Sequence, residues 1–423
     1  MTGKLVTIDV KSEIGKLEAV LLHTPGAEVE NMTPRNAQRA LYSDILNLSI
    51  AQKEYEQVSG VINMFSKTYQ IKDLLVKLLD NHTEREALIG KICVSEGVTD
   101  YFEDLMDMSS KGLAQVLIEG LPAKINTLSA FLKDDYYALP PLYNYYFTRD
   151  ASVTIGNRIL ICKMASSVRM RESLINEAIF RKKRVFDCEL INSHDFQPGN
   201  NDIYMEGGDI LIAREDILLV GNGPRTSSQG IDMLINRLCR TGCKERMHVV
   251  VQQLPETPES FIHLDMAFTL LDTHTAMVFE PLILGENQYQ TVHITIDNGK
   301  VSKIKSVSNI PSILKKLGME VEPIICGGSA DEWNQEREQW HSGANFFALE
   351  PGKVLSYARN VHTLNELNKN GFDIFTAWDV INGKSDVKKS KQCVITIDGS
   401  ELPRGGGGPR CMTMPLRRAP VKW

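Results

Sequence analysis

The sequence predicts an α/β protein in which about five strand–turn–strand units close into a ring, interrupted by a bundle of helices. Three segments indicate the repeat, because each begins with a carboxylate and reaches a polar turn seven residues later. Their heads lie 59 (209 − 150) and 56 (265 − 209) residues apart, as expected for a unit that brings acidic or imidazole side chains to one common end. The segments are Asp150–Asn157, Asp209–Asp216 and Asp265–Asp272. Helical spacing without strand-like alternation between residues 71 and 138 predicts the bundle.

The N-terminal region predicts two strands followed by a helix. Two apolar runs within residues 4–24 are separated by SEIGK, which is typical of a strand, a turn and a second strand that ends at Pro25 and Gly26. From about 34 to 60, apolar residues recur at helical spacing with polar residues between them.

The next region predicts three to five short amphipathic helices between residues 71 and 138. We expect N-caps at Thr83 and Thr99, because a hydroxyl can accept a hydrogen bond from the first turn. We expect helix ends at Gly120 and Pro122. Residues 71–138 are therefore predicted to form an inserted helical domain.

Strand units return from residue 139 and are connected by predicted helices at 169–181 and 227–240. Together with the N-terminal pair, about five units are visible, which favours a closed radial arrangement over an open sheet. The ring would comprise residues 1–70 and 139–423. Two further units are weaker. Residues 344–360 contain a Pro-Gly turn but no acidic head, and residues 391–402 lead into a run of glycines.

The composition narrows the class of protein. Of the 423 residues, 43% are hydrophobic and 24% charged, as in an ordinary soluble globular protein. A net charge of −6 argues against nucleic acid as a main partner, and no uncharged apolar run approaches the ~18 residues of a membrane span. The N-terminus has no apolar signal region, and the eight scattered cysteines contain no CxxC pair, so we expect a reduced, cytoplasmic setting. Neither a Walker loop nor a GxGxxG after a strand is present, so no nucleotide cofactor is indicated.

Cys411 is the candidate nucleophile. It follows Gly405–Gly408, a flexible run that lets the backbone approach a ligand or move over it. The neighbouring Arg410 carries a positive charge that would favour the thiolate. A disordered C-terminal tail is the alternative interpretation, but the apolar residues directly after the cysteine argue against it.

Three acidic clusters would share the site with the cysteine. His263 and Asp265 form a His-x-Asp pair which, on a strand, would point to the same face and could act on one substrate. Glu206 and Asp209 straddle two glycines, so the two carboxylates must either spread apart or share a cation. Asp150 follows an arginine, and a plain salt bridge is its alternative interpretation.

Such a set fits a guanidinium substrate. Opposed carboxylates can each accept two N–H bonds from the planar group, which leaves its central carbon open to attack. A thiolate from Cys411 would attack this carbon, and ammonia would leave after protonation by His263. Water deprotonated by His263 would then hydrolyse the S-alkylthiouronium intermediate. No metal is needed.

The motifs that carry these residues resemble those of bacterial arginine deiminases. The matching blocks occur in the family's order over nearly the whole chain, and their combination is highly specific. The blocks are SEIGKLEAVLLHTPG at 12–26, FTRD at 147–150, MEGGD at 205–209, HLD at 263–265, LEPG at 349–352, ARN at 358–360 and RGGGGPRCMTMPL at 404–416.

The resemblance implies a fold and an activity. The fold would be a five-bladed, pseudo-symmetric α/β propeller of ββαβ units, as in the guanidine-modifying superfamily, with an inserted α-helical bundle. The activity would be hydrolysis of free L-arginine to L-citrulline and ammonia without a cofactor. A homo-oligomer, a dimer or larger, is also expected from the family.

The resemblance also implies a role for each site residue. Cys411 would be the nucleophile and His263 the general acid and base, while Asp150 and Asp265 would hold the guanidinium. Glu206 would orient His263, and Asp209 would support the turn beneath them. The positions that match the family's contacts to the amino-acid end of the substrate are Asn144, Phe147, Arg169 and Arg225, with Arg171 as an alternative to Arg169.

Two departures from the family pattern concern the substrate's tail. Some members carry an arginine within the glycine run, whereas Gly405–Gly408 is unbroken here, and Met266 and Ala267 stand where many members have Thr-Val. These departures bear on the contacts to the substrate's tail and on the kinetics more than on the reaction type.

Other activities stay open as alternatives. Amidinotransferases, methylarginine hydrolases and peptidylarginine deiminases use the same nucleophile and histidine, and a catalytically inactive protein could retain the pocket to bind arginine. A further alternative is a metal-dependent hydrolase whose ligands would be Asp150, Glu206, Asp209, His263 and Asp265. Metal dialysis and citrulline production separate these classes.

Overall fold

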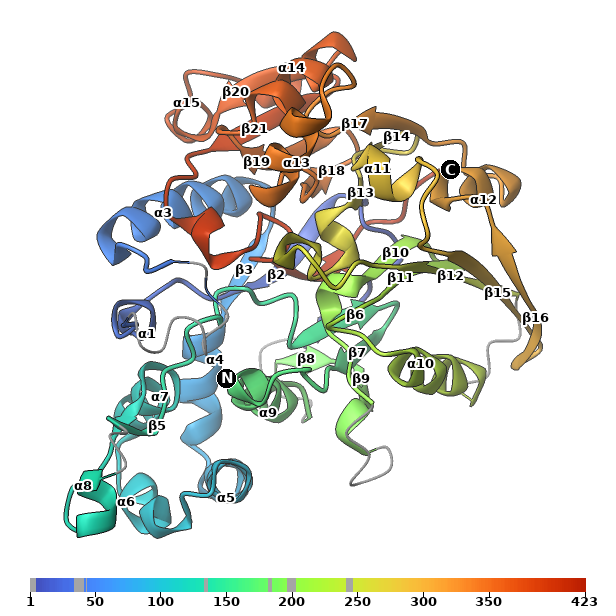
Figure 1. Ribbon diagram of the computed structural model, residues 1–423. Helices are drawn as coiled ribbons and strands as arrows, with labels where there is room; N and C mark the ends of the chain where they lie inside the picture. Colours follow the sequence, from blue (N-terminus) through green and yellow to red (C-terminus); the bar gives the residue numbers. More distant parts are fainter. Residues whose placement is uncertain are drawn as a thin grey trace.

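Small β-sheets of similar construction surround the middle of the molecule (Figure 1). The structure is a computed structural model that describes residues 5–33, 42, 44–132, 136–181, 185–195, 203–240 and 246–423. Within these residues, five sheets have three or more strands. Their strands, in hydrogen-bonded order, are β22 (Met414–Arg418), β2 (Leu17–Leu22) and β3 (Lys67–Gln70); β6 (Ser152–Ile155), β7 (Arg158–Ile161) and β9 (Glu189–Asn192); β10 (Ile210–Arg214), β11 (Ile217–Asn222), β12 (Met247–Gln253), β15 (Thr291–Asp297) and β16 (Lys300–Val307); β13 (Phe268–Leu270), β14 (Thr275–Val278) and β17 (Glu322–Ile325); and β18 (Phe347–Glu350), β19 (Lys353–Tyr357), β21 (Cys393–Ile397) and β20 (Asp373–Thr376).

Each sheet repeats one pattern of strand pairing. Two strands pair antiparallel, and the second of them pairs in parallel with a later strand, as in β6, β7 and β9. The same order recurs in the other sheets. A parallel pair needs a crossover, and helices supply it. The helices of these connections are α1 (Ala27–Glu30), α3 (Leu48–Phe65), α9 (Met170–Arg181), α10 (Ser228–Arg240), α11 (Glu280–Ile283), α12 (Ile310–Lys316), α14 (Val361–Lys369) and α15 (Ala377–Ile381). One further helix, α13 (Glu332–Trp340), connects β17 to β18 of the next sheet. The predicted strand–turn–strand units that begin at 150, 209, 265 and 344 are confirmed, as are the helices at 169–181 and 227–240. The predicted unit at 391–402 was wrong, because it holds one strand, β21, which is the parallel partner of β19.

The first sheet joins the two ends of the described chain. β2 pairs antiparallel with β22, while its other edge carries β3 in parallel. Since Cys411 lies three residues before β22, this pairing fixes the place of the candidate nucleophile.

The N-terminal prediction was partly wrong. β1 (Val6–Thr7) does not form a hairpin with β2 but pairs in parallel with β8 (Phe186–Asp187). The predicted helix at 34–60 is α3, which begins later, because Asn47 caps it by accepting a hydrogen bond from the backbone of Ile50. Residues 34–41 and 43 lie outside the described residues.

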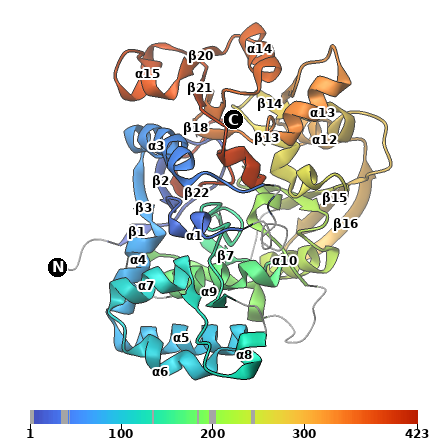
Figure 2. The same ribbon diagram turned by 60° about the vertical axis from the view of Figure 1, so that its left-hand side comes forward.

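Helices α4–α8 lie together on one side of the molecule (Figures 1 and 2). Asn81 and Ser109 provide the side-chain caps of α5 and α7, so the predicted caps at Thr83 and Thr99 were wrong, whereas α7 ends at Gly120 as expected. Leu121 and Pro122 form β4, which pairs with β5, a short interruption that the helical pattern did not predict. These elements are α4 (Ile71–Leu79), α5 (His82–Glu96), α6 (Phe102–Met106), α7 (Ser110–Glu119), β4 (Leu121–Pro122), α8 (Leu128–Leu132) and β5 (Tyr137–Leu139).

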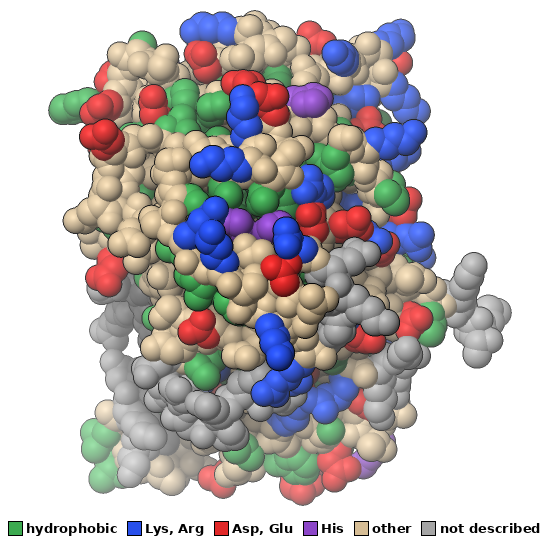
Figure 3. All heavy atoms as spheres, turned by 90° about the vertical axis from the view of Figure 1, so that its right-hand side faces the viewer, with side chains coloured by type: hydrophobic (Ala, Val, Ile, Leu, Met, Phe, Trp, Pro, Cys, Tyr) green, Lys and Arg blue, Asp and Glu red, His purple; other side chains and the backbone are tan. Residues whose placement is uncertain are grey.

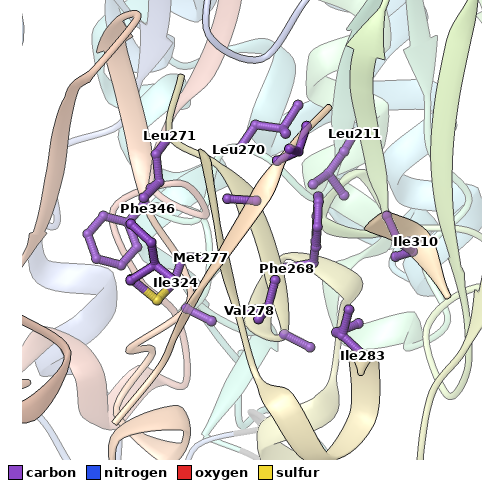
Figure 4. Packing of buried hydrophobic residues seen from close by; sticks show 14 of the residues in the cluster. Leu211, Phe268, Leu270, Leu271, Met277, Val278, Ile283, Ile310, Ile324 and Phe346 are labelled. Atoms are coloured by element: carbon purple, nitrogen blue, oxygen red, sulfur yellow. The ribbon is translucent and has the colours of Figure 1, made fainter. Parts of the chain in front are cut away.

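A large apolar core holds the later sheets together. Side chains from β10, β13, β14, β17 and α12 meet in it, as Figure 4 shows for Leu211, Phe268, Met277, Ile324 and Ile310. All three residues of β13 are buried, and the one polar side chain among them, Thr269, donates a hydrogen bond to the carbonyl of Ala344. The acidic heads that precede these strands are therefore anchored to a rigid base.

The surface carries charges of both signs. On the face that Figure 3 shows, acidic and basic side chains are interspersed without a broad area of one sign. Among the described residues, no helix is both long and apolar enough to cross a membrane.

Candidate active site

The predicted site residues meet at one pocket of about 210 Å³. Eight of them line it: Asn144, Phe147, Asp150, Arg169, Glu206, Arg225, His263 and Cys411. The other two lie directly behind the lining. Asp265 Oδ2 is 3.7 Å from Cys411 Sγ, and Asp209 Oδ1 accepts a hydrogen bond of 2.8 Å from the backbone of Leu264.

The elements explain why these residues converge. Asp150 lies just before β6, Asp209 ends a 3₁₀ turn directly before β10, and Asp265 lies in a 3₁₀ turn before β13. The three carboxylates therefore occupy equivalent positions, each just before the first strand of a different sheet. His263 precedes that 3₁₀ turn rather than lying on a strand, so the expected strand geometry for the His-x-Asp pair was wrong.

His263 is held between carboxylates. Its Nε2 lies 2.9 Å from Glu206 Oε2, and its Nδ1 lies 3.7 Å from Asp150 Oδ1. Burial alone would lower the pKa of His263, but Asp150 and the hydrogen bond to Glu206 raise it to about 9. Burial would raise the pKa of Glu206, but the hydrogen bond from His263 and the charge of Arg225 lower it to about 2. The imidazole therefore carries its proton at neutral pH.

The two glycines of MEGGD are required by close approaches. A Cβ at position 207 would collide with the backbone of Arg149, and one at position 208 would collide with the ring of His263. Burial raises the pKa of the adjacent Asp209 to about 6. Asp209 supports the segment of His263 through its hydrogen bond to Leu264.

Asp150 already binds a guanidinium within the protein. Arg169 Nη1 lies 2.6 Å from Asp150 Oδ2, and the other N–H groups of Arg169 bond to Glu172 and to the carbonyls of Asn144 and Phe147. Arg169 thus lines the pocket, but its N–H groups already donate to these partners within the protein. The alternative, Arg171, instead donates to Glu96 and to the carbonyls of Leu117 and Pro140, and ties α9 to the helical region.

Asp265 binds a second internal guanidinium. Arg410 Nη1 lies 2.7 Å from Asp265 Oδ2, and Arg410 also pairs with the buried Glu13. Among the described residues, Asp150 Oδ1 and Asp265 Oδ1 are buried and accept no hydrogen bond. Each of the two carboxylates therefore keeps one oxygen that a further N–H donor could use.

Cys411 is a buried thiol next to negative charge. Burial, followed by Asp265 and Asp150, raises its pKa well above the ordinary value. The charge of Arg410 lowers the pKa of Cys411, as the sequence suggested. Arg410 is paired with Asp265 and Glu13, however, and the pKa of the thiol stays raised. The free thiol is therefore protonated at neutral pH.

The glycine run packs tightly over the pocket. A Cβ at position 405 would collide with the hydroxyl of Tyr146, and one at 407 would lie 2.6 Å from the ring of Phe147. The hydroxyl of Tyr357 donates to the carbonyl of Gly407 over 2.9 Å. Gly406 has a φ of 84°, a conformation that favours glycine.

One set of residues could hold a cation. Asp150, Glu206 and His263 each offer a ligand atom, and these atoms lie within 4.8 Å of one another. A metal would have to displace the proton that the raised pKa keeps on His263. It would also compete with Arg169 for Asp150.

Three residues at the site were not identified from the sequence. Glu13 and Glu172 bind the internal arginines, and Asn345 contacts Cys411. Arg410 was identified for its charge, but its hydrogen bond to Asp265 was not predicted. Glu13 lies in the SEIGK block, which offered a signal, but Asn345 comes from a turn far away in sequence that no motif marks.

Comparison with known proteins agrees with this geometry. The sequence profile of the arginine deiminase family matches residues 38–418. The chain is 32% identical to the arginine deiminase of Mycoplasma capricolum over 419 residues, covering 97% of each chain. It is 32% identical to that of Listeria innocua over 438 residues, covering 98% of this chain and 99% of the relative.

Solved structures share the fold at low sequence identity. The amidinotransferase SxtG from Microseira wollei has a TM-score of 0.50 at 13% identity, covering 98% of each chain. The N-terminal domain of ArgZ, an arginine dihydrolase of cyanobacteria, has a TM-score of 0.51 at 13% identity, covering 95% of this chain and 98% of that one. These neighbours place the mixed α/β fold among amidinotransferase-type structures. By the profile match and the full-length relatives, the chain belongs to the arginine deiminase family.

Proposed function

We propose that the protein hydrolyses free L-arginine to L-citrulline and ammonia through a covalent thiouronium on Cys411. Membership of the arginine deiminase family supports the overall reaction. The observation that carries the residue assignment is the pocket itself, in which a buried cysteine and a protonated histidine lie with two buried carboxylates.

The guanidinium would bind between Asp150 and Asp265. Both carboxylates already accept guanidinium N–H groups from Arg169 and Arg410, so their setting suits that ion. Their remaining oxygens, Asp150 Oδ1 and Asp265 Oδ1, are the acceptors we assign to the substrate. A bound cation would offset the two negative charges that raise the pKa of Cys411, so substrate binding itself would favour the thiolate.

In the proposed steps Cys411 attacks and leaves as a thiolate, while His263 first gives up a proton and then regains one. The thiolate forms an S–C bond to the guanidinium carbon, and the protonated His263 gives its proton to the departing nitrogen, which leaves as ammonia. Neutral His263 then takes a proton from water, which attacks the thiouronium carbon. The C–S bond breaks, the hydroxyl proton of the adduct is lost to solvent as citrulline forms and leaves, and the thiolate and the imidazolium are restored. Glu206 would hold the imidazole in place throughout.

The amino-acid end of arginine would lie toward Arg225, Asn144 and Phe147. Arg225 lines the pocket and offers a charged fork for a carboxylate. Since the N–H groups of Arg169 are engaged by Asp150, Glu172 and two carbonyls, we assign Arg169 to holding Asp150 and to the substrate only after that network opens. Recognition of free arginine would then depend chiefly on Arg225.

We also infer the larger architecture from the strand pairing. The five sheets, each with a hairpin and a parallel third strand, would be the blades of an α/β propeller, and residues 71–138 its helical insertion. We further propose that the protein is cytoplasmic, forms a homo-oligomer and needs no cofactor. Sedimentation of the purified protein tests the oligomer.

The decisive experiment is to trap the intermediate. Acid quench during turnover followed by mass spectrometry should find a substrate-derived adduct on the Cys411 peptide. Cys411→Ser and Cys411→Ala should form no citrulline, while Asp150→Ala and Asp265→Ala should also lose arginine binding in calorimetry. Cys393→Ala, which alters a buried cysteine in β21 outside the pocket, is the matched control. Full turnover by Cys411→Ala would end the covalent proposal.

A metal-dependent hydrolase is the second candidate, because Asp150, Glu206 and His263 are grouped closely enough to share a cation. Prolonged dialysis against a chelator should leave citrulline formation unchanged under our proposal. Loss of activity on dialysis and its recovery with a divalent metal would favour the alternative.

A further inference from the structure

Asn345 is a buried asparagine beside the candidate nucleophile. It lies in the turn before β18 and has no exposed surface. Its backbone N–H donates to the carbonyl of Ser342 over 3.0 Å, which fixes the turn. The side chain is thereby presented to the segment that carries Cys411.

The hydrogen bonds of Asn345 fix which way its amide points. Oδ1 faces two backbone N–H groups, those of Arg410 at 2.9 Å and Cys411 at 3.4 Å, so this end must be the oxygen. Nδ2 on the opposite end lies 3.2 Å from Cys411 Sγ and 3.2 Å from the carbonyl of Asp265. The amide therefore directs an N–H group at the sulfur.

A second observation comes from the glycine run. A Cβ at position 408 would lie 2.5 Å from Asn345 Oδ1, closer than real contacts allow. Glycine at this position lets the loop backbone lie directly against the amide of Asn345. The loop and Asn345 are thus fitted to each other.

The electrostatic setting of the sulfur shows why such a donor matters. Asp265 Oδ2 lies 3.7 Å from Sγ, and the carboxylates around it oppose the loss of the thiol proton. A thiolate accepts a hydrogen bond more strongly than a thiol, so an N–H donor of fixed direction favours the ionised form.

We propose that Asn345 is a catalytic residue, whose Nδ2–H group hydrogen-bonds to Cys411 Sγ and stabilises the thiolate that attacks the substrate. Its Oδ1 meanwhile keeps the backbone of Arg410 and Cys411 in place. This inference rests on the proposed function for the nature of the attack, but the ionisation of Cys411 can be measured without any substrate.

The test compares two variants that separate donation from anchoring. Asn345→Ala removes both ends of the amide, whereas Asn345→Asp keeps an acceptor for the Arg410 N–H group, removes the donor and adds a negative charge beside the sulfur. The apparent pKa of Cys411 is measured from the pH dependence of iodoacetamide labelling, resolved to the Cys411 peptide by mass spectrometry. We expect an upward shift of about one to two units in Asn345→Ala and a larger one in Asn345→Asp.

Turnover gives the second measurement. We expect kcat for citrulline formation to fall by about 10- to 100-fold in Asn345→Ala while KM changes by less than about threefold. Asn176→Ala, which alters an equally buried asparagine of α9 bonded to Ser152 and Tyr145, controls for general loosening and should shift neither quantity. Circular dichroism confirms that each variant is folded.

The outcomes distinguish the two proposals. An unchanged Cys411 pKa in Asn345→Asp would overturn the donor role and leave Asn345 as an anchor only. Absence of citrulline from the wild-type protein, with the labelling shifts present, would instead overturn the proposed function and keep the hydrogen bond to Cys411.

Discussion

At the scale of single residues, the site is a set of buried charges that hold one another in unusual protonation states. His263 is protonated because Asp150 and Glu206 surround it, and Glu206 is ionised because His263 and Arg225 surround it. Burial alone would favour the neutral form of both side chains, so neither charge would be stable without its charged neighbours. The residues are therefore coupled, and removal of one should change the titration of the next.

This coupling predicts how stability depends on pH. The folded pKa of His263, about 9, lies above its ordinary value of 6.5, so its stabilising contribution is complete below pH 6.5 and is lost as the pH rises through 9. The free energy of unfolding of the wild type, relative to His263→Gln, should fall by about 3 kcal/mol between pH 6.5 and 9.5. Urea unfolding at both pH values measures it.

A control for this prediction is His82→Gln, at an exposed position of α5. The stability difference between the wild type and His82→Gln should stay constant over the same range. A His263→Gln difference that is equally flat would contradict the raised pKa of His263.

Sequence reasoning identified the residues that carry the proposed chemistry but not their partners. Cys411, His263 and the acids could be found because their motifs are distinctive and occur in order. Arg169 and Arg410 were also named from the sequence, but their pairing with Asp150 and Asp265 was not, because a motif gives no direction for a long side chain. The same limit hid Asn345, since its contact depends on a turn 66 residues before Cys411 (411 − 345).

At the scale of elements, the glycine run is held at its base by helix α3. The buried carboxylate of Glu54 accepts hydrogen bonds from the backbone N–H groups of Ser400, Glu401 and Leu402. One side chain from the N-terminal part of the chain thus fixes the segment from which the glycine run begins.

Glu54→Gln should loosen that anchor. The amide would place an N–H donor against backbone donors, so we expect a loss of about 1–3 kcal/mol in stability. We also expect faster hydrogen exchange at residues 400–408, and a lower kcat. Exchange mass spectrometry and citrulline assays measure these effects.

Glu56→Gln on the same helix is the matched control, because Glu56 is exposed. Equal exchange rates in both variants would show that Glu54 does not hold the glycine run.

The elements themselves were predicted to different degrees. The hairpins β6–β7, β10–β11 and β13–β14 follow from apolar runs on either side of polar turns, and the structure has them. The 3₁₀ turn after His263 could not be read from an apolar run, because the strand begins only at Phe268. Where paired strands lie far apart in sequence, as β1 and β8 do, no local sequence pattern indicates the pairing.

At the scale of the whole molecule, the helical region shares its core with the strands. Leu75 and Leu117 belong to the same buried cluster as Ile159 of β7 and Met414 of β22. The sequence suggested residues 71–138 as a separate insertion, and that boundary stays a prediction. The shared core indicates that the helical region and the strands stabilise each other.

Leu75→Ala tests this dependence. Truncation of a fully buried leucine should cost about 2–5 kcal/mol. If the core is shared, calorimetry should show the main unfolding transition shifted to lower temperature as a whole. A new transition at low temperature, with the remaining one unchanged, would show that the helical region unfolds independently.

The pairing of β2 with β22 has a consequence for biosynthesis. A nascent polypeptide emerging from the ribosome exposes β2 first, and its antiparallel neighbour begins 392 residues after β2 ends (414 − 22). Cys411 arrives with it. Under the proposed function, products of premature termination before Cys411 would therefore form no citrulline, however much of the remaining protein had already folded.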